Sequence, residues 1–278
     1  MKWNGSSWSR QMSGRPIEFT SIWGIDSSNV WLTDEKGMIL NWNGTVWSLQ
    51  PSGTSNGLHA TWGTDANNVW AVGHSGTILH WNGTVWSSLP SGTSEWLYDV
   101  WGTDASNVWI VGGGGTILQW DGTAWRIQER GTANTLHYVG GRDINNVWVL
   151  GQGNTVLKWN GTAWSAQTRY SPNGLSSMWG SQLDNIWGVG DRGTISRWNG
   201  TGWLKQRSGS SSMLYDVWGS DGNNVWAVGS RGTILKWNGT AWSPQRSGTS
   251  NWIVSVWGTD ASDVWAVGEG GTILRYQP

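Results

Sequence analysis

One eleven-residue motif recurs along this chain at a constant spacing. It reads Gly-Thr-Ile-Leu-His-Trp-Asn-Gly-Thr-Val-Trp at residues 76–86, and its copies follow at steps of 39 residues with no insertion or deletion. The motif predicts a β-hairpin: a strand over residues 77–81, a type I′ turn on Asn82-Gly83, and a second strand from Trp86. The first Trp of the motif falls at Trp3, Trp42, Trp81, Trp120, Trp159, Trp198 and Trp237, and Tyr276 has this position at the end of the chain.

Each 39-residue unit contains four short runs of β-branched and aromatic residues, bounded by Gly, Asn, Asp or Ser. In one unit these runs cover residues 58–62, 68–72, 77–81 and about 85–89, which indicates four strands. Seven such units predict an all-β fold, a seven-bladed β-propeller with four antiparallel strands per blade, as a single domain over residues 1–278. The chain begins just before a fourth strand and ends with a third, so the N-terminal strand should complete the last blade.

The strand directions divide the repeat between two faces of the predicted disc. The loops that join the first to the second strand and the third to the fourth share one face, here called the lower face. The other loops and the connections between blades share the upper face. Of the 29 Trp, 27 fall at four repeat positions next to lower-face loops, and we call these the repeated tryptophans. Trp96 and Trp252 are off this register and belong to the upper face, and Gly140 stands where a repeated Trp is expected.

Composition narrows the classes of function. Seventeen Lys and Arg balance 18 Asp and Glu, so charge gives no reason to expect nucleic acid or an acidic membrane as a partner. No apolar run is long enough to insert into a bilayer, and the absence of Cys excludes disulfides and thiolate chemistry. Low charge with much Gly, Ser, Thr, Asn and Trp favours a secreted or cell-surface protein. We expect no cofactor and no metal, since the four His residues lack ligand spacing: His59, His74, His80 and His137.

The blade sequences resemble those of known propellers. Residues 256–260 (Val-Trp-Gly-Thr-Asp), 264–268 (Val-Trp-Ala-Val-Gly) and 271–274 (Gly-Thr-Ile-Leu) resemble the blades of photosystem II assembly-factor propellers and other Asp-box proteins. The Val-Trp-x-Val run, Gly-x-Ile strand and Asn-Gly turn are also similar to tectonin-type lectin propellers. The resemblance spans the whole chain, and its tectonin side implies glycan binding. The chain departs from both patterns, because only Asp121 keeps an acid in the hairpin turn and tectonin repeats are usually shorter.

The repeated tryptophans have two interpretations. As core residues, each would remove about 150–250 Å² from water, roughly 4–6 kcal/mol gross as an upper bound. As binding residues, one per blade would offer an indole face to a pyranose ring. The core interpretation is favoured, because most large aromatic side chains are buried. The repeated-site alternative consists of Trp42, Trp81, Trp120, Trp159, Trp198 and Trp237.

Differences between the repeats point to another candidate site. Positions that vary are free of the shared blade fold, and they gather in the segments that form the upper face. Aromatic residues stand there beside Asp and His, which is what a sugar site needs, whereas the alternative is an unconstrained surface. The candidate ligand-binding residues are His59, Trp96, Tyr98, Asp99, His137, Tyr138, Tyr215, Asp216 and Trp252.

Three functions follow from these patterns. The first is a non-catalytic, lectin-like propeller with several weak glycan sites that act by avidity. The second is a protein-interaction or assembly scaffold whose upper face binds a partner protein. A hydrolase is the weakest, because the sequence offers no plausible Ser-His-Asp or Cys-His set, and we predict no catalytic residues. A glycan or a protein is therefore the expected partner.

Overall fold

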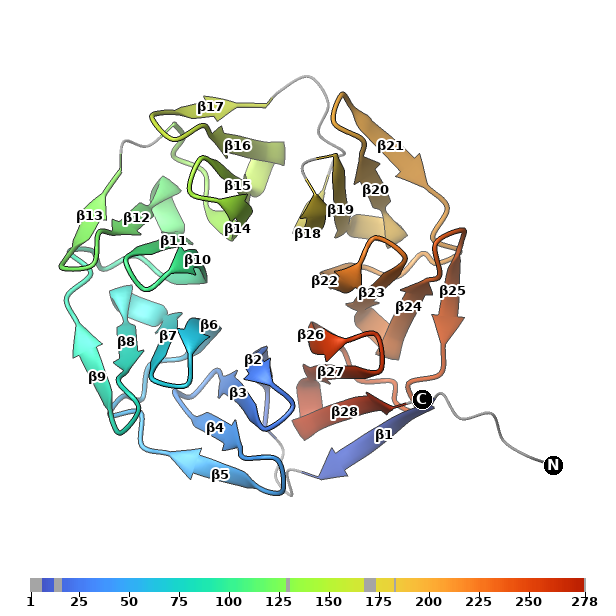
Figure 1. Ribbon diagram of the computed structural model, residues 1–278, viewed down its shortest axis with the longest axis horizontal. Coiled ribbons are helices and arrows are strands. Elements are labelled where there is room, and N and C mark those ends of the chain that lie inside the picture. The colour runs from blue at the N-terminus through green and yellow to red at the C-terminus, as the bar shows by residue number, and fades with distance from the viewer. Residues whose placement is uncertain (1–6, 13–16, 129–130, 168–173, 183, 278) are drawn as a thin grey trace.

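Seven four-stranded antiparallel sheets stand in a ring in the computed structural model of the protein (Figure 1). The structure describes residues 7–12, 17–128, 131–167, 174–182 and 184–277, so Trp3 lies outside the described residues. The first strand of each blade is innermost and the fourth is outermost. The predicted seven-bladed propeller is therefore confirmed.

The strand bounds repeat from blade to blade. Blades 1 to 3 comprise β2 (Phe19–Asp26), β3 (Asn29–Asp34), β4 (Ile39–Trp42), β5 (Trp47–Gln50), β6 (Leu58–Asp65), β7 (Asn68–Gly73), β8 (Ile78–Trp81), β9 (Trp86–Leu89), β10 (Leu97–Asp104), β11 (Asn107–Gly112), β12 (Ile117–Trp120) and β13 (Trp125–Ile127). Blades 4 and 5 comprise β14 (Leu136–Asp143), β15 (Asn146–Gly151), β16 (Thr155–Trp159), β17 (Trp164–Ala166), β18 (Leu175–Gln182), β19 (Asn185–Gly190), β20 (Ile195–Trp198) and β21 (Trp203–Gln206). Blade 6 comprises β22 (Leu214–Asp221), β23 (Asn224–Gly229), β24 (Thr233–Trp237) and β25 (Trp242–Gln245).

Both ends of the chain contribute to blade 7. Its strands lie in the order β1 (Ser7–Met12), β28 (Thr272–Gln277), β27 (Asp263–Gly268) and β26 (Ile253–Asp260). β1 and β28 are antiparallel, with Trp8 opposite Tyr276. One strand from the N-terminus thus completes a blade whose other three strands come from the C-terminal end, as the repeat register predicts.

Short 3-10 turns join the second and third strands in six blades: η1 (His74–Gly76), η2 (Gly113–Gly115), η3 (Gln152–Asn154), η4 (Asp191–Gly193), η5 (Ser230–Gly232) and η6 (Glu269–Gly271). In the described part of the chain, no helix has the length and apolar character needed to cross a membrane.

The hairpin between the third and fourth strands differs from the prediction. Trp81 pairs directly with Trp86, so four residues form the connection, and of Asn82 and Gly83 only the glycine has a positive φ, 94°. The Asn82 Oδ1 atom accepts the N–H groups of Thr84 and Val85, each at 3.0 Å. The predicted type I′ turn is therefore wrong: the asparagine side chain closes the loop together with a backbone hydrogen bond from Asn82 N–H to the Val85 carbonyl at 3.3 Å.

The repeated tryptophans pack in the contacts between neighbouring blades. Trp187 is fully buried, and its ring centroid lies 4.9 Å from Trp237 and 5.3 Å from Trp242 in the next blade. The Arg197 guanidinium lies 5.3 Å from the centre of the same ring, close enough for a cation–π contact. The Trp at the start of the second strand is buried in all seven blades: Trp31, Trp70, Trp109, Trp148, Trp187, Trp226 and Trp265.

The tryptophans near the end of the first strand reach a glycine in the next blade. The Cη2 atom of Trp62 lies 2.7 Å from where a Cβ on Gly102 would stand, so only glycine admits the ring. The six such pairs are Trp23–Gly63, Trp62–Gly102, Trp101–Gly141, Trp179–Gly219, Trp218–Gly258 and Trp257–Gly24. Between blades 4 and 5, Gly140 replaces the Trp and the Tyr138 hydroxyl lies beside it. A cavity of about 40 Å³ remains there, lined by both blades.

Candidate functional site on the upper face

Two tryptophans differ from all the others that the structure describes. Trp96 and Trp252 are each 46% exposed, whereas the described repeated tryptophans are buried or half-buried. Each stands just before a first strand, β10 or β26, in the connection from the preceding blade. They occupy the same repeat position, so the blades present them on the same, upper face.

A cluster of aromatic and imidazole rings surrounds Trp96 between blades 2 and 3. The indole of Trp96 stacks on the imidazole of His74, with ring centroids 3.9 Å apart and planes inclined by 21°. His59 on β6 lies 5.2 Å from Tyr98 on β10, centroid to centroid, and 4.7 Å from His74. Four rings from two blades thus form one continuous surface.

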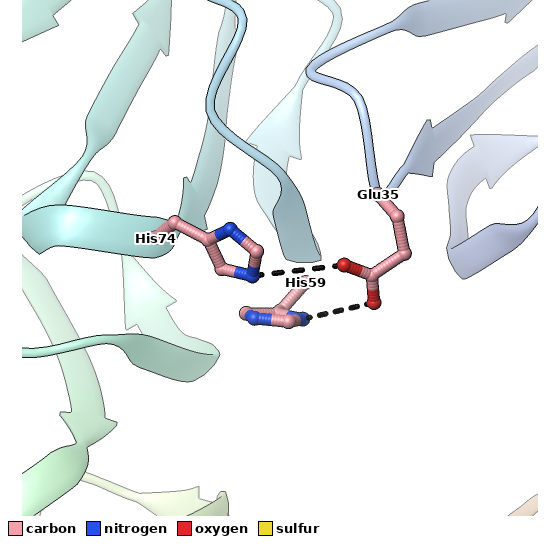
Figure 2. A group of neighbouring side chains, drawn as sticks. All are labelled: Glu35, His59 and His74. Carbon is pink, nitrogen blue, oxygen red and sulfur yellow. Dashed lines mark ion pairs between the residues drawn. The ribbon is translucent and has the colours of Figure 1, made fainter.

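A carboxylate from a third blade faces this cluster (Figure 2). Glu35, in the loop between β3 and β4, places its two oxygens 3.7 Å from His59 Nδ1 and 3.6 Å from His74 Nε2. Both imidazoles point toward the carboxylate. The three side chains each offer a ligand atom, and these atoms lie within 4.8 Å of one another. Among the described residues, Glu35, His59 and His74 are therefore the group that could hold a metal ion.

Burial sets the protonation of this group. Burial, helped by the neighbouring His74, lowers the pKa of His59 to about 4, and burial also raises the pKa of Glu35. His59 is consequently neutral at physiological pH, so its contact with Glu35 is not an ion pair there. At 3.6–3.7 Å neither contact is a hydrogen bond by ordinary geometry. Direct bonds between these three groups therefore do not explain why they converge.

The second exposed tryptophan has a simpler setting. The centroid of Trp252 lies 5.7 Å from that of Tyr215 in the preceding blade. The Glu269 Oε2 atom accepts the backbone N–H of Trp252 at 3.4 Å, which places an acidic group beside the indole. Met213, before β22, is also exposed. This patch spans blades 6 and 7, across the ring from the Trp96 cluster.

Two of the predicted ligand-binding residues hold the centre of the ring together instead. The Asp99 carboxylate accepts the N–H of Val100 and, at 2.9 Å, the N–H of Val139 in the next blade. Asp216 accepts the N–H of Val256 in its own next blade at 2.9 Å. Burial raises the pKa of Asp99 to about 8 and raises that of Asp216. Each carboxyl group therefore joins the first strands of two blades, a structural role.

The remaining predicted residues are dispersed. Tyr138 packs into the interface between blades 4 and 5, and burial raises its pKa well above the usual value. His137 is half-buried and lines a separate pocket of about 280 Å³ with Gln152, Asp191 and Met213. The structure thus brings together His59, Trp96 and Tyr98 in one patch and Tyr215 with Trp252 in another, but does not unite all nine.

The six tryptophans of the repeated-site alternative have indole faces that are covered by other side chains. Trp42 and Trp237 are buried, and the other four are half-buried: Trp81, Trp120, Trp159 and Trp198. Their rings contact other tryptophans within the hairpin or across the blade contact. This packing favours the structural interpretation of these residues.

Glu35 and His74 were not predicted as site residues. They occupy the same repeat position in adjacent blades, and the residue at this position varies along the chain. The available signal was the variability of this repeat position. That residue 35 of one blade faces residues 59 and 74 of the next blade follows only from the way the blades are arranged in the ring.

Comparison with known proteins supports the fold. No model of a protein family matches the sequence, and no curated protein matches it either. Among solved structures, YCF48 from Cyanidioschyzon merolae is 16% identical over 98% of this chain and 99% of its own, with a TM-score of 0.80. YCF48 bound to D1 peptide is also 16% identical, over 100% and 98%, with a TM-score of 0.83.

An enzyme variant has the same fold as well. A catalytically inactive variant of virginiamycin B lyase from Staphylococcus aureus with quinupristin is 13% identical over 98% of this chain and 99% of its own, with a TM-score of 0.76. At these identities the likeness establishes the fold alone. The resemblance to photosystem II assembly-factor propellers is supported at that level, and no similarity to tectonin lectins is shown.

Proposed function

We propose that this protein is a non-catalytic interaction propeller whose upper face binds a segment of a partner protein through Trp96 and Trp252. The observation that carries the proposal is that these two indoles are exposed while the described repeated tryptophans are covered. Tryptophan is among the commonest anchors of protein interfaces. A structurally similar propeller, YCF48, has been solved bound to D1 peptide, which is consistent with this use of the fold.

The charges beside the two indoles favour a basic partner segment. Burial, with the negative charges of Glu95 and Glu35, raises the pKa of Tyr98 in the Trp96 cluster. Burial and the charge of Glu269 have the same effect on the pKa of Tyr215. An exposed aromatic face beside carboxylates is suited to a Lys or Arg side chain, which gains a cation–π contact and an ionic contact together.

A peptide-display library tests this function with the purified protein. We expect the selected peptides to be enriched in Lys and Arg. The double variant Trp96→Ala/Trp252→Ala should weaken their binding by about 30-fold or more, the effect of losing an interface anchor of about 2 kcal/mol.

The matched control is Leu49→Ala/Leu204→Ala, which removes two exposed apolar side chains from the outer strands β5 and β21 and should leave affinity unchanged. Undiminished binding by the tryptophan variant would refute the upper face as the binding surface.

Glycan binding is the second candidate, and the same observation supports it in a restricted form. An exposed indole with polar side chains nearby is also suited to a pyranose ring. Trp96 has imidazoles and a carboxylate nearby, and Trp252 has the Glu269 carboxylate, so the two patches would be the sites rather than the seven hairpins. A glycan array probed at several protein concentrations distinguishes the two candidates. Binding that survives in Trp96→Ala/Trp252→Ala would refute the two patches as the sites, and no binding to any glycan would exclude this function.

A further inference from the structure

We infer that Glu35, His59 and His74 form a binding site for one divalent transition-metal ion, with Zn²⁺ as the best fit. Two imidazoles and one carboxylate are a common protein ligand set for zinc. Here they come from two adjacent blades and from three separate segments of the chain, and their ligand atoms lie within 4.8 Å of one another.

The distances suit a metal better than direct contacts. Ligands around a tetrahedral Zn²⁺ with bonds of about 2.0–2.1 Å stand roughly 3.3 Å apart. The two contacts to the Glu35 oxygens are 3.7 Å and 3.6 Å, too long for hydrogen bonds yet only a few tenths of an ångström from that spacing. The three ligand atoms lie within 4.8 Å of one another, so an ion between them would bind all three side chains after rotations that bring the widest pair closer.

One ligand atom of this group is unsatisfied in the described structure. His74 Nε2 is buried and has no hydrogen-bond partner among the described residues, whereas the His59 atom that faces Glu35 is Nδ1. A buried polar atom without a partner is costly, so such atoms indicate a missing ligand. His74 Nε2 is also the atom that faces Glu35, which makes it the ligand atom of this residue.

The surroundings hold the ligands in place and leave a side open. Trp96 stacks on the His74 ring at 3.9 Å and fixes its plane. Gly57 lies where a side chain would strike the same ring, since a Cβ there would be 2.8 Å from His74 Cε1. The Glu35 side chain is 41% exposed, so the carboxylate side of the site is open to solvent. Three protein ligands and an open position therefore describe the site.

Isothermal titration calorimetry of Zn²⁺ into the full chain, prepared without a histidine tag, tests this site. We expect one Zn²⁺ per chain. His59→Phe and His74→Phe keep an aromatic ring in each place but remove the ligand nitrogen, and should weaken binding by more than about 100-fold, beyond the 10–100-fold cost of losing an outer-sphere partner. Glu35→Gln removes the anionic ligand and should also weaken zinc binding. Because the Glu35 side chain is 41% exposed, this substitution should not disturb the hydrophobic core.

The repeat provides a matched control. His137 occupies the repeat position of His59, but Gly113 and Gln152 stand where Glu35 and His74 would be, so His137→Ala should bind zinc like the parent. Added Zn²⁺ should raise the melting temperature of the parent and of His137→Ala, and not that of His74→Phe. Absence of saturable one-to-one binding by the parent, or equal loss in His137→Ala, would overturn the inference. These readouts involve no peptide, so they are independent of the proposed function.

Discussion

The repeated and the off-register tryptophans have the same side chain and opposite uses. Trp187 is enclosed by Trp237, Trp242 and Arg197, whereas Trp252 meets Tyr215 on one side and solvent on the other. The difference follows from position in the blade. Residues next to lower-face loops point into the contact between blades, whereas residues just before the first strand lie on the upper face. An aromatic side chain is therefore a building element or a candidate anchor according to its register.

Removing one buried repeated tryptophan should have the largest effect on stability. Trp187→Ala deletes a fully buried ring and leaves a cavity between blades 5 and 6, so we expect a loss of about 3–5 kcal/mol in the free energy of unfolding. Trp252→Ala removes an exposed ring and should change stability by no more than about 0.5 kcal/mol. Chemical denaturation of the two variants side by side measures the difference. Equal losses would remove the distinction between the two classes.

The contact between blades 4 and 5 lacks the Trp near the end of the first strand, because Gly140 stands in its place, and it allows a closer comparison. In Gly102→Ala the new methyl group would meet Trp62 Cη2 at 2.7 Å and the Asn107 carbonyl oxygen at 2.6 Å, and we expect a cost of about 1–3 kcal/mol. In Gly180→Ala, where Gly140 has taken the place of the Trp, the nearest atom is Ile186 Cγ1 at 3.0 Å.

The second substitution should therefore cost clearly less in a thermal unfolding experiment. A Gly180→Ala variant as unstable as Gly102→Ala would show that backbone conformation, and not the indole ring, requires glycine at this position.

The centre of the ring should make stability depend on pH. Burial raises the pKa of Asp99 to about 8 from its ordinary value of 3.8. The contribution of the protonated carboxyl group to the free energy of unfolding is therefore complete below about pH 4 and is lost as the pH rises through 8. Asp99→Ser introduces the residue that other blades have here, and the Ser255 Oγ atom already accepts the Ile22 N–H in this way at 3.3 Å.

The melting temperature of the parent should consequently fall between pH 7 and pH 8 by more than that of Asp99→Ser. The expected gap is roughly 2–4 °C, because linkage to a pKa of about 8 gives about 1 kcal/mol across that unit of pH. Some dependence should remain in the variant, since Asp216 keeps its raised pKa. Parallel curves for the two proteins would contradict the assignment to Asp99.

The ring could be predicted from the sequence because its information is repeated. A constant 39-residue step fixes the strands, the faces and the closing strand at once, and an error in one unit is corrected by the other six. The turn at Asn82-Gly83 shows the limit: the sequence names a turn, but whether Asn82 takes a positive φ or accepts hydrogen bonds depends on the four-residue spacing of the paired strands.

The candidate site was only partly predictable, because it depends on contacts between different repeats. Variability pointed to His59, Trp96 and Tyr98, which do meet. The same criterion also selected Asp99 and Asp216, whose side chains turn to the centre of the ring and bind backbone N–H groups. Within the described residues, adjacent positions on a first strand thus face different surroundings, and only the structure separates them.

Oxidation of tryptophan by N-bromosuccinimide, mapped by peptide mass spectrometry, tests the central distinction most directly. At low reagent concentration under native conditions, Trp96 and Trp252 should be modified first among the described tryptophans, because their indoles are exposed. The buried repeated tryptophans, such as Trp187 and Trp226, should react only after unfolding. Modification of Trp187 or Trp226 at the same rate as Trp96 would contradict the account.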